Sequence, residues 1–266
     1  MYYVCGISDK GTVRDHNEDA FLIDGVVLSK AQLETDIRPP FIAAVADGVG
    51  GEASGEVASR LALELLSSVK YGSKVNMQSK INGIHGKLVR YGSAHRGCTN
   101  MQTTLCAIAV DEQENASVIN VVDSRMYRYR NGKIRQISTD QSLVQLLYEQ
   151  GKISREEQHT HEHKNVIFPV LGNVNSSPEP EIKPITGGIR GGDVIIICTD
   201  GISDYITQGQ FEEALALPMS LPKRLQRLTE IAVENGSTDN MTAIGVSCCG
   251  VHTQIKHSSS KRKQVR

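Results

Sequence analysis

Short apolar runs alternate with polar stretches along the chain, and two of these runs end in the same way. Phe41–Ala46 is followed by Asp47 and the glycine-rich segment Gly48–Gly51. Val194–Ile197 leads, through two small residues, to Asp200 and a glycine. A short apolar run that stops at a turn residue is typical of a buried strand. The pattern therefore predicts two buried strands that each deliver an Asp-Gly pair to the edge of a core.

Other strands and two tight hairpins are predicted from similar patterns. Asp24-Gly25 and Asn131-Gly132 each stand between apolar or alternating arms, which indicates hairpin turns. Residues 29–40 are polar and are expected to form a loop, and 152–184 is expected to leave the core. The remaining strands are expected over residues 2–7, 20–28, 101–110, 117–122, 125–137 and 241–249.

Apolar residues spaced four apart predict helices between these strands. Val57, Leu61, Leu65 and Val69 fall on one face of the first such helix. Further helices are expected over residues 74–91, 141–150, 210–216 and 221–235. Strands in hairpins combined with pairs of half-buried helices favour a layered α+β domain over alternating βαβ units.

Composition narrows the class of protein. The chain has 266 residues, 39% of them hydrophobic, and a formal net charge of -1, so no strong field favours nucleic acid or a membrane surface. No apolar run has the length of a membrane span, and the first residues lack a signal-peptide layout. Six cysteines without a CxxC pair indicate reduced core residues. We expect a cytoplasmic monomer that binds neither nucleic acid nor membrane.

Acidic residues stand at strand ends or in the adjoining loops at five places: Glu18-Asp19, Asp47, Asp123, Asp200 and Asp239. A set of carboxylates without zinc-type Cys/His spacing favours Mg²⁺ or Mn²⁺. Divalent ions in such a site can clamp a phosphate and activate water, and the nearby Arg14 could hold two phosphate oxygens. The alternative is that the acids are separate turn residues and that Arg14 is a solvated charge.

Seven short motifs in a fixed order give the chain a family resemblance. The chain resembles the metal-dependent type 2C (PPM) serine/threonine protein phosphatases in their compact bacterial form, from about Tyr3 to Cys249. The motifs are RDHNED (14–19), ADGVGG (46–51), TTL (103–105), DSRMY (123–127), TDQS (139–142), CTDGISD (198–204) and TDNMT (238–242).

The resemblance implies a fold, a cofactor and a set of roles. It implies an α+β fold, a four-layer α-β-β-α sandwich of two mostly antiparallel β-sheets flanked by helix pairs, over residues 1–250, with a flap at about 145–172. It also implies two Mn²⁺ or Mg²⁺ ions, with a third, weaker one, and in-line attack on phosphoserine or phosphothreonine by a hydroxide that bridges the metals. The implied roles are metal binding for Asp47, Gly48, Asp200, Asp239 and Asp123, water ordering for Glu18 and Asp19, phosphate binding for Arg14 and support of Asp239 by Asn240.

Four positions depart from the family pattern. Val122 and Gln102 stand where glycine is usual, Gln141 replaces a common histidine, and Val49 replaces a histidine of eukaryotic members. A β-branched residue beside Asp123 weakens the assignment of the third metal site. The ligands of the two main ions are all present, which argues against an inactive relative.

Alternatives of other classes remain open at this point. One is a phosphoprotein-binding regulatory module of low activity, and another is an enzyme that acts on small phosphomonoesters. His159, His161 and His163 alternate and could share a face toward a transition metal, although a solvated flap explains them as well. Residues 251–266 form a basic tail that is expected to be disordered. The expected partners are phosphoproteins, including a cognate serine/threonine kinase.

Overall fold

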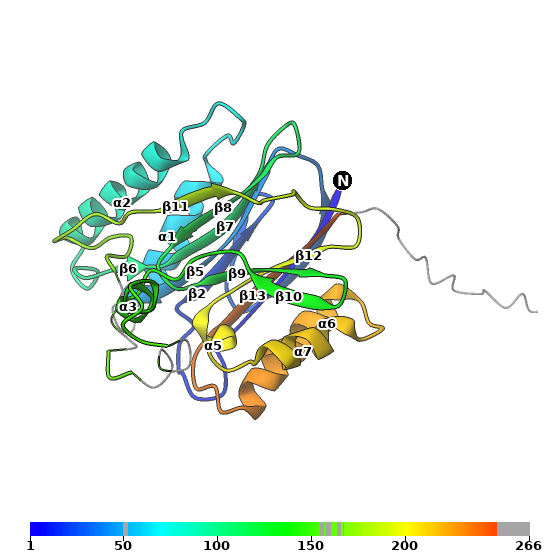
Figure 1. Ribbon diagram of the computed structural model, residues 1–266. Helices are drawn as coiled ribbons and strands as arrows, with labels where there is room; N and C mark the ends of the chain where they lie inside the picture. Colours follow the sequence, from blue (N-terminus) through cyan, green and yellow to red (C-terminus); the bar gives the residue numbers. More distant parts are fainter. Residues whose placement is uncertain (50–52, 155–156, 158–160, 164–165, 167, 249–266) are drawn as a thin grey trace, which may run out of the picture.

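The fold is a sandwich of two antiparallel sheets between two helix layers (Figure 1). It is taken from a computed structural model, which describes residues 1–49, 53–154, 157, 161–163, 166 and 168–248. The basic tail predicted for 251–266, together with His159, Gly50 and Gly51, therefore lies outside the described residues.

The first sheet has six strands in the order β10-β9-β12-β13-β1-β4. Each of its described pairings is antiparallel. Its strands are β1 (Tyr2–Asp9), β4 (Gln32–Ile37), β9 (Arg125–Arg130), β10 (Lys133–Gln136), β12 (Val194–Cys198) and β13 (Met241–Cys248).

The second sheet has seven strands and the order β11-β8-β7-β5-β2-β3, with β6 paired to β5. Its described pairings are also antiparallel. Its strands are β2 (Asp19–Ile23), β3 (Val26–Leu28), β5 (Phe41–Val49), β6 (Gln102–Thr103), β7 (Leu105–Val110), β8 (Ala116–Val121) and β11 (Glu181–Pro184).

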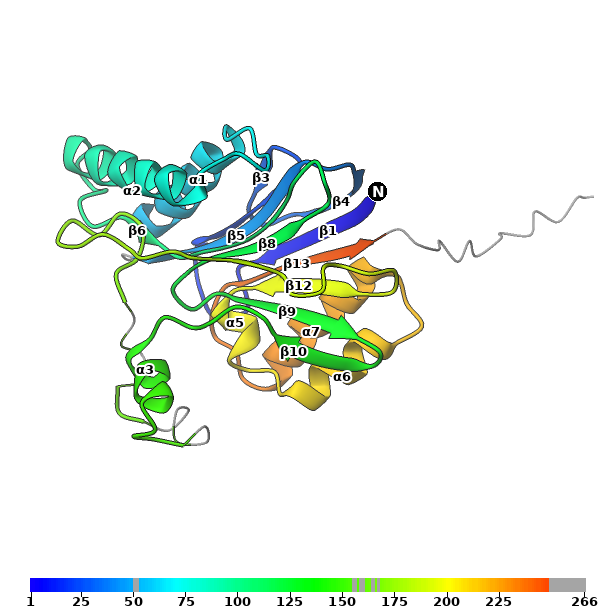
Figure 2. The same ribbon diagram turned by 45° about the horizontal axis from the view of Figure 1, so that its top comes forward.

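Helices cover the outer face of each sheet. α1 (Ala53–Ser67) and α2 (Met77–Ala94) lie over the second sheet, and α6 (Gln208–Ala216) and α7 (Leu221–Glu234) lie over the first (Figure 1). The short helix α5 (Asp200–Ser203) follows β12 directly. α3 (Leu143–Glu149) stands away from the sandwich (Figure 2). None of the described helices is long and apolar enough to cross a membrane.

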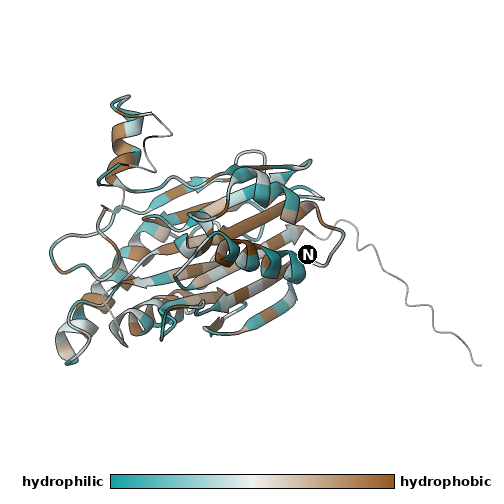
Figure 3. Ribbon diagram, turned by 90° about the horizontal axis from the view of Figure 1, so that it is seen from below, coloured by the Kyte–Doolittle hydropathy of each residue, from teal (hydrophilic) through white to brown (hydrophobic). Residues whose placement is uncertain are grey.

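The central strands are apolar throughout because both of their faces are buried. Along β12, Ile195 and Ile197 belong to the core between the sheets, whereas Ile196 and Cys198 pack with α6 and α7. Side chains of a strand alternate between its faces, so a strand buried on both sides reads as a continuous apolar run. Apolar residues accordingly concentrate on the strands, and polar ones are frequent on helices and loops (Figure 3).

The predicted layered sandwich is confirmed, and two of the predicted loops are wrong. Residues 32–37 form β4, which pairs with β1 at the edge of the first sheet. Its alternating exposure explains its polar sequence, because one face of an edge strand meets water. β11 lies within the stretch expected to leave the core and also forms a sheet edge, where its final Pro184 is tolerated.

Candidate metal centre

The predicted site residues lie where several strands begin or end. Asp19 is the first residue of β2 and pairs directly with Asp47, near the end of β5. Asp200 opens α5 immediately after β12. Asp239 lies two residues before β13, and Asp123 lies in the connection from β8 to β9. Antiparallel pairing brings the end of one strand beside the start of the next, so these acids share one rim of the sandwich.

The rim carboxylates are close enough to disturb one another. Asp47 and Asp200 are within hydrogen-bonding reach of each other. Burial, reinforced by the charges of Asp19, Asp200 and Asp123, raises the pKa of Asp47 well above its usual value. Burial likewise raises the pKa of Asp200, with the charges of Asp204 and Asp239 adding to the effect. The rim therefore gathers negative charge that the described side chains do not fully neutralise.

Asp19 is the most enclosed of these acids, with 1% of its surface exposed. Burial raises its pKa to about 7, although the hydroxyl of Thr199 donates to its Oδ2 at 2.8 Å. Its other oxygen, Oδ1, is buried and has no hydrogen-bond partner among the described residues, and the same holds for Asp200 Oδ1. A buried polar atom without a partner costs about 1–3 kcal/mol. Unpartnered carboxylate oxygens in an oxygen-only cluster fit a hard divalent cation.

Two backbone contacts fix the strand ends that carry these acids. A Cβ on Gly48 would lie 2.1 Å from the carbonyl oxygen of Gly55 in α1, so only glycine allows β5 to approach that helix. A Cβ on Gly201 would lie 1.9 Å from the carbonyl oxygen of Asn240, which joins α5 to the loop before β13 in the same way. The glycines that follow Asp47 and Asp200 are therefore required for packing.

Asp47 is held by Thr103, the last residue of β6, and by Thr104, which follows it. Its carbonyl oxygen accepts from the Thr103 hydroxyl at 2.8 Å and from the Thr104 backbone N–H at 2.9 Å. Its own N–H donates to Thr104 Oγ1 at 3.0 Å. The backbone of Asp47 is thus fixed on both sides, while its carboxylate is left to the rim.

Asn240 ties Asp239 to the loop that carries Arg14 and Glu18. Its N–H donates to Asp239 Oδ1 at 2.8 Å, and its side-chain oxygen accepts from Glu18 N–H at 2.8 Å. Its side-chain NH₂ donates to the carbonyls of Lys10 and His16, each at 2.9 Å. The predicted support of Asp239 is therefore a backbone hydrogen bond, and the side chain of Asn240 organises the opposite loop.

Arg14 forms an ion pair with Asp239, with Nη2 and Oδ2 2.8 Å apart. About half of the Arg14 side chain remains exposed. Glu18 lies close enough for its pKa to be affected by Arg14 and Asp239; burial raises that pKa, and the charge of Arg14 opposes the rise. The predicted phosphate-binding arginine thus reaches the rim and is accessible there.

Asp123 joins the same charge cluster from the other side. Burial raises its pKa to about 7, and the charge of Asp200 adds to the rise. Its neighbour Ser124 shares a 2.8 Å hydrogen bond with Thr104 Oγ1, the hydroxyl that also holds Asp47. Asp123 is therefore linked to Asp47 through two hydroxyl groups.

The described side chains at the rim do not form a complete set of metal ligands in this structure. No group of three His, Cys, Asp or Glu side chains among the described residues is arranged to hold an ion. Asp239 pairs with Arg14 instead, and neighbouring carboxylates repel one another unless a cation neutralises them. His161 and His163 lie with ring centroids 5.5 Å apart, and with His159 outside the described residues the three-histidine hypothesis stays a prediction.

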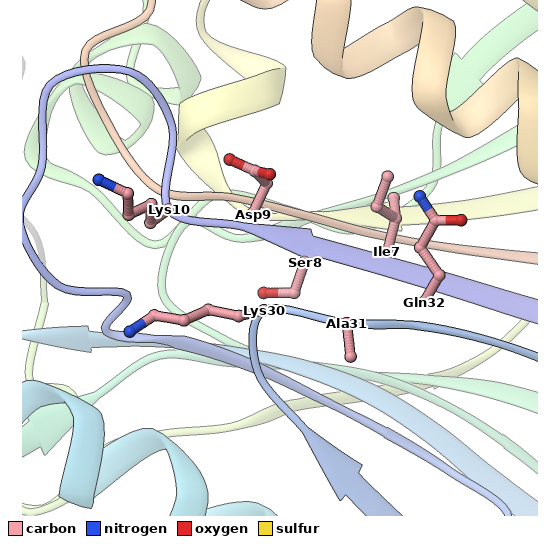
Figure 4. Close-up of a pocket in the computed structure, with 7 residues that line it drawn as sticks. All are labelled: Ile7, Ser8, Asp9, Lys10, Lys30, Ala31 and Gln32. Carbon is pink, nitrogen blue, oxygen red and sulfur yellow. The ribbon is translucent and has the colours of Figure 1, made fainter.

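A hollow of about 350 Å³ is a separate feature of the structure (Figure 4). It is lined by residues 7–10 of β1 and its following loop and by residues 30–32. In Figure 4 the amino groups of Lys10 and Lys30 lie on the same side of this hollow. None of the predicted metal ligands lines it. The candidate site is therefore the rim itself and not this hollow.

Several residues that serve the site were not predicted. They are four hydroxyl side chains that bond to the acids or to one another, and an ion pair whose charges act on Asp200: Thr103, Thr104, Thr199, Ser124, and Arg125 with Asp204. Each lies within or beside a quoted motif, so its position was visible. The bonding partner of each residue could not be predicted, because every one of these bonds joins residues that are distant in sequence.

Comparisons with known proteins show the family and the fold of the chain. Residues 15–243 match the family described as Protein phosphatase 2C. A serine/threonine phosphatase, stp, of Listeria innocua is 30% identical over 246 residues, covering 89% of this chain and 92% of that protein. The structure of the serine/threonine phosphatase PstP of Mycobacterium tuberculosis superposes with a TM-score of 0.75 at 28% identity, covering 93% of this chain and 99% of the other. A structure of the catalytic domain of a serine/threonine protein phosphatase PstP in complex with two manganese ions has a TM-score of 0.72 at 27% identity, covering 93% of this chain and 99% of the other.

Proposed function

The chain belongs to the protein phosphatase 2C family and is a metal-dependent serine/threonine protein phosphatase, and from that premise we propose which residues carry the reaction. Asp47, Asp200 and Asp239, with the carbonyl of Gly48, hold the two ions. Asp123 and Asp200 hold a third, weaker one. The observation that carries this assignment is that Asp19 and Asp200 each have a buried oxygen without a hydrogen-bond partner among the described residues.

The bound ions would supply charge neutralisation, a clamp on the phosphoryl oxygens and activation of water. Glu18 and Asp19 accept hydrogen bonds from water at the rim. Asp19 is suited to this because one of its oxygens already accepts from Thr199 and the other is free of protein donors among the described residues.

Arg14 binds the phosphoryl group of the substrate. Its guanidinium is exposed, presents several N–H donors and pairs in this structure with the carboxylate of Asp239. A phosphate dianion presents acceptor oxygens to the guanidinium, as a carboxylate does, but it carries more negative charge. Arg14 therefore exchanges a carboxylate partner for the substrate, which leaves Asp239 to an ion.

Asn240 positions both sides of the phosphate site. It fixes Asp239 through its backbone and the loop of Arg14 and Glu18 through its side chain. A change at this position would move the phosphate-binding arginine and a metal ligand together.

The substrates are proteins carrying phosphoserine or phosphothreonine. Such groups are made by serine/threonine kinases, so we include a phosphorylated cognate kinase among them. The cytoplasm is the proposed location, since the described cysteines (Cys5, Cys98, Cys106, Cys198 and Cys248) are unpaired, as in a reducing compartment. A single domain over residues 1–250, a flap over about 145–172 and a monomeric state belong to the same proposal.

Turnover of a phosphothreonine peptide with Mn²⁺, with and without a chelator, tests the assignment. Asp47→Asn and Asp239→Asn are expected to lose turnover by on the order of 100-fold or more, by analogy with the loss of one group that stabilises transition-state charge. Asp24→Asn at an exposed hairpin tip makes the same chemical change away from the rim and should leave turnover unchanged.

The outcomes separate the competing functions. Near-normal turnover by Asp47→Asn would remove the proposed metal centre. Tight phosphopeptide binding by the unaltered protein without turnover would identify a regulatory module. Faster turnover of small phosphomonoesters than of the peptide would identify a metabolic phosphatase.

A further inference from the structure

Val122, beside Asp123, has a backbone conformation that valine rarely adopts. Its φ is +84°, in the left-handed region. For a β-branched residue this is a true outlier, because the branched Cβ crowds its own backbone. A residue held there costs on the order of 1–3 kcal/mol and persists only where its surroundings enforce it.

The surroundings that enforce it come largely from one residue, Gln141. The N–H of Val122 donates to Gln141 Oε1 at 2.9 Å, and its carbonyl accepts from the N–H of Gln141 at 2.9 Å. The side-chain NH₂ of Asn120 adds a bond of 3.2 Å to the same carbonyl. The Val122 side chain is fully buried in the core under α1 and α2, so it is anchored as well.

Gln141 is itself fixed from two other directions. Its side-chain NH₂ donates to the Glu179 carbonyl at 2.7 Å, and its own carbonyl accepts from Phe168 N–H at 3.0 Å. Its neighbour Asp140 forms an ion pair with Arg125 at 2.8 Å. Gln141 and Asp140 thus hold the turn from β8 to β9 on both sides of Asp123, through Val122 and Arg125 respectively.

We propose that Gln141 is a positioning residue for Asp123. It holds Val122 in the left-handed conformation and so directs Asp123 to the rim, where Asp123 lies within electrostatic reach of Asp47 and Asp200. Ser124 and its bond to Thr104 fix the other side of Asp123. This inference rests on the proposed function in one respect, namely that Asp123 binds an ion.

Position 122 needs a supporting residue such as Gln141 because it is occupied by valine. A glycine adopts positive φ without a Cβ penalty and needs little help. The effect of removing Gln141 should therefore depend on what stands at position 122. This dependence distinguishes a positioning role from a general contribution to stability.

The experiment is a Mn²⁺ titration of the metal-free full chain by calorimetry, with thermal unfolding as a second measurement. Asp123→Ala identifies the Mn²⁺ binding step that depends on Asp123. Gln141→Ala is expected to weaken that step by about 10-fold, the lower end of what loss of a supporting contact costs a metal site. The tighter steps, which depend on Asp47, should be unchanged.

Two further variants and a control complete the test. Val122→Gly in the Gln141→Ala background should restore the weakened step, and Gln141→Glu, which keeps an oxygen for the Val122 N–H, should retain more of it than Gln141→Ala. Gln226→Ala, on the exposed surface of α7, is the matched control.

The proposal is overturned if Gln141→Ala binds Mn²⁺ as the unaltered chain does, if Val122→Gly restores nothing, or if no step depends on Asp123. Failure of the proposed function looks different. In that case Asp47→Asn and Asp239→Asn would bind Mn²⁺ and turn over phosphopeptide normally, whatever happens at Gln141.

Discussion

The two ends of strand β12 carry aspartates in opposite environments. Asp193 precedes the strand and is 2% exposed, and both of its oxygens are bonded by Arg130 at 2.6 Å. The Arg190 N–H adds a third bond at 2.7 Å. Asp200 follows the strand, has one buried oxygen without a partner among the described residues, and lies among other acids.

The pKa shifts of these two residues differ in sign. Burial alone would raise the pKa of Asp193, but the bonds from Arg130 and the Arg190 N–H lower it below its usual value. Burial and the charges of Asp204 and Asp239 raise the pKa of Asp200. One end of the strand is neutralised by the protein's own side chains, and the other end is left short of positive charge. An enzyme that binds cations gives up stability at the second end.

The largest effect is expected from removing a charge at the functional end. Asp200→Asn should lower phosphopeptide turnover with Mn²⁺ by on the order of 100-fold or more, because a proposed metal ligand is lost. The metal-free variant should nevertheless unfold at a higher temperature, since one of several repelling carboxylates is gone. Turnover assays and thermal unfolding without metal check the two parts. A lower unfolding temperature would mean that repulsion at the rim is not the main cost.

The same substitution at the other end should do the reverse. Asp193→Asn leaves the partly buried Arg130 without its anion, which we expect to lower the free energy of unfolding by roughly 3 kcal/mol. Urea unfolding measures this change. Turnover per folded molecule should be unchanged because Asp193 is remote from the rim. A large loss of turnover at full folding would contradict the separation of the two ends.

The sequence predicts the central strand β12 better than it predicts the edge strands of the sheets. The apolar run Val194–Ile197 identifies β12, and its burial on both faces is what makes the run continuous. Edge strands such as β4 are polar on one face, so their residues read as a loop until pairing with β1 is known. The hydrophobic pattern of a sequence indicates which residues are buried, and an edge strand such as β4 has few buried residues.

The site was predicted in part for a related reason. Asp47 and Asp200 were found because each follows an apolar run, Asp123 and Asp239 because they stand at predicted strand ends or in adjoining loops, and Arg14 because it lies near the first acids. The resemblance to a family then assigned their individual roles. The contacts that hold them were not predictable, since the bonds of Thr199 to Asp19 and of Gln141 to Val122 depend on tertiary packing. The left-handed conformation of Val122 runs against the preference of valine, so the residue alone would have predicted the opposite.

Stability should depend on pH in opposite directions for the rim acids Asp19 and Asp123 and for Asp193. Asp19 and Asp123 have pKa values of about 7 in the folded protein, against about 3.9 when unfolded. Between these values the folded protein binds more protons, so its stability falls as pH rises from 4 through 7. Metal-free protein should therefore be more stable at pH 5 than at pH 8, by at least about 1 kcal/mol.

Asp193 has the opposite sign and a different range. Its lowered pKa gives stability that is present above its unfolded value of about 3.9 and is lost as pH falls further. Urea unfolding at pH 3, 5 and 8, on the unaltered chain, Asp19→Asn and Asp193→Asn, separates the contributions. Asp19→Asn should flatten the slope between pH 5 and 8, and Asp193→Asn should flatten the one below pH 4. A metal-free protein that gains stability from pH 5 to 8 would contradict the raised pKa values.

The smallest effect is expected for an ion pair of the same chemistry at the surface. Arg60 and Glu64 lie one turn apart on α1, with Nη2 and Oε1 3.6 Å apart and about half of each side chain exposed. Water screens such a pair and both side chains lose rotamer freedom to form it, so Arg60→Ala should change the free energy of unfolding by about 0.5 kcal/mol or less. Adding salt should reduce even this difference, whereas the Asp193–Arg130 pair should respond less to salt because it is partly buried. If urea unfolding gave equal losses for Arg60→Ala and Asp193→Asn, burial would not be what distinguishes the stabilising acids of this protein from the rest.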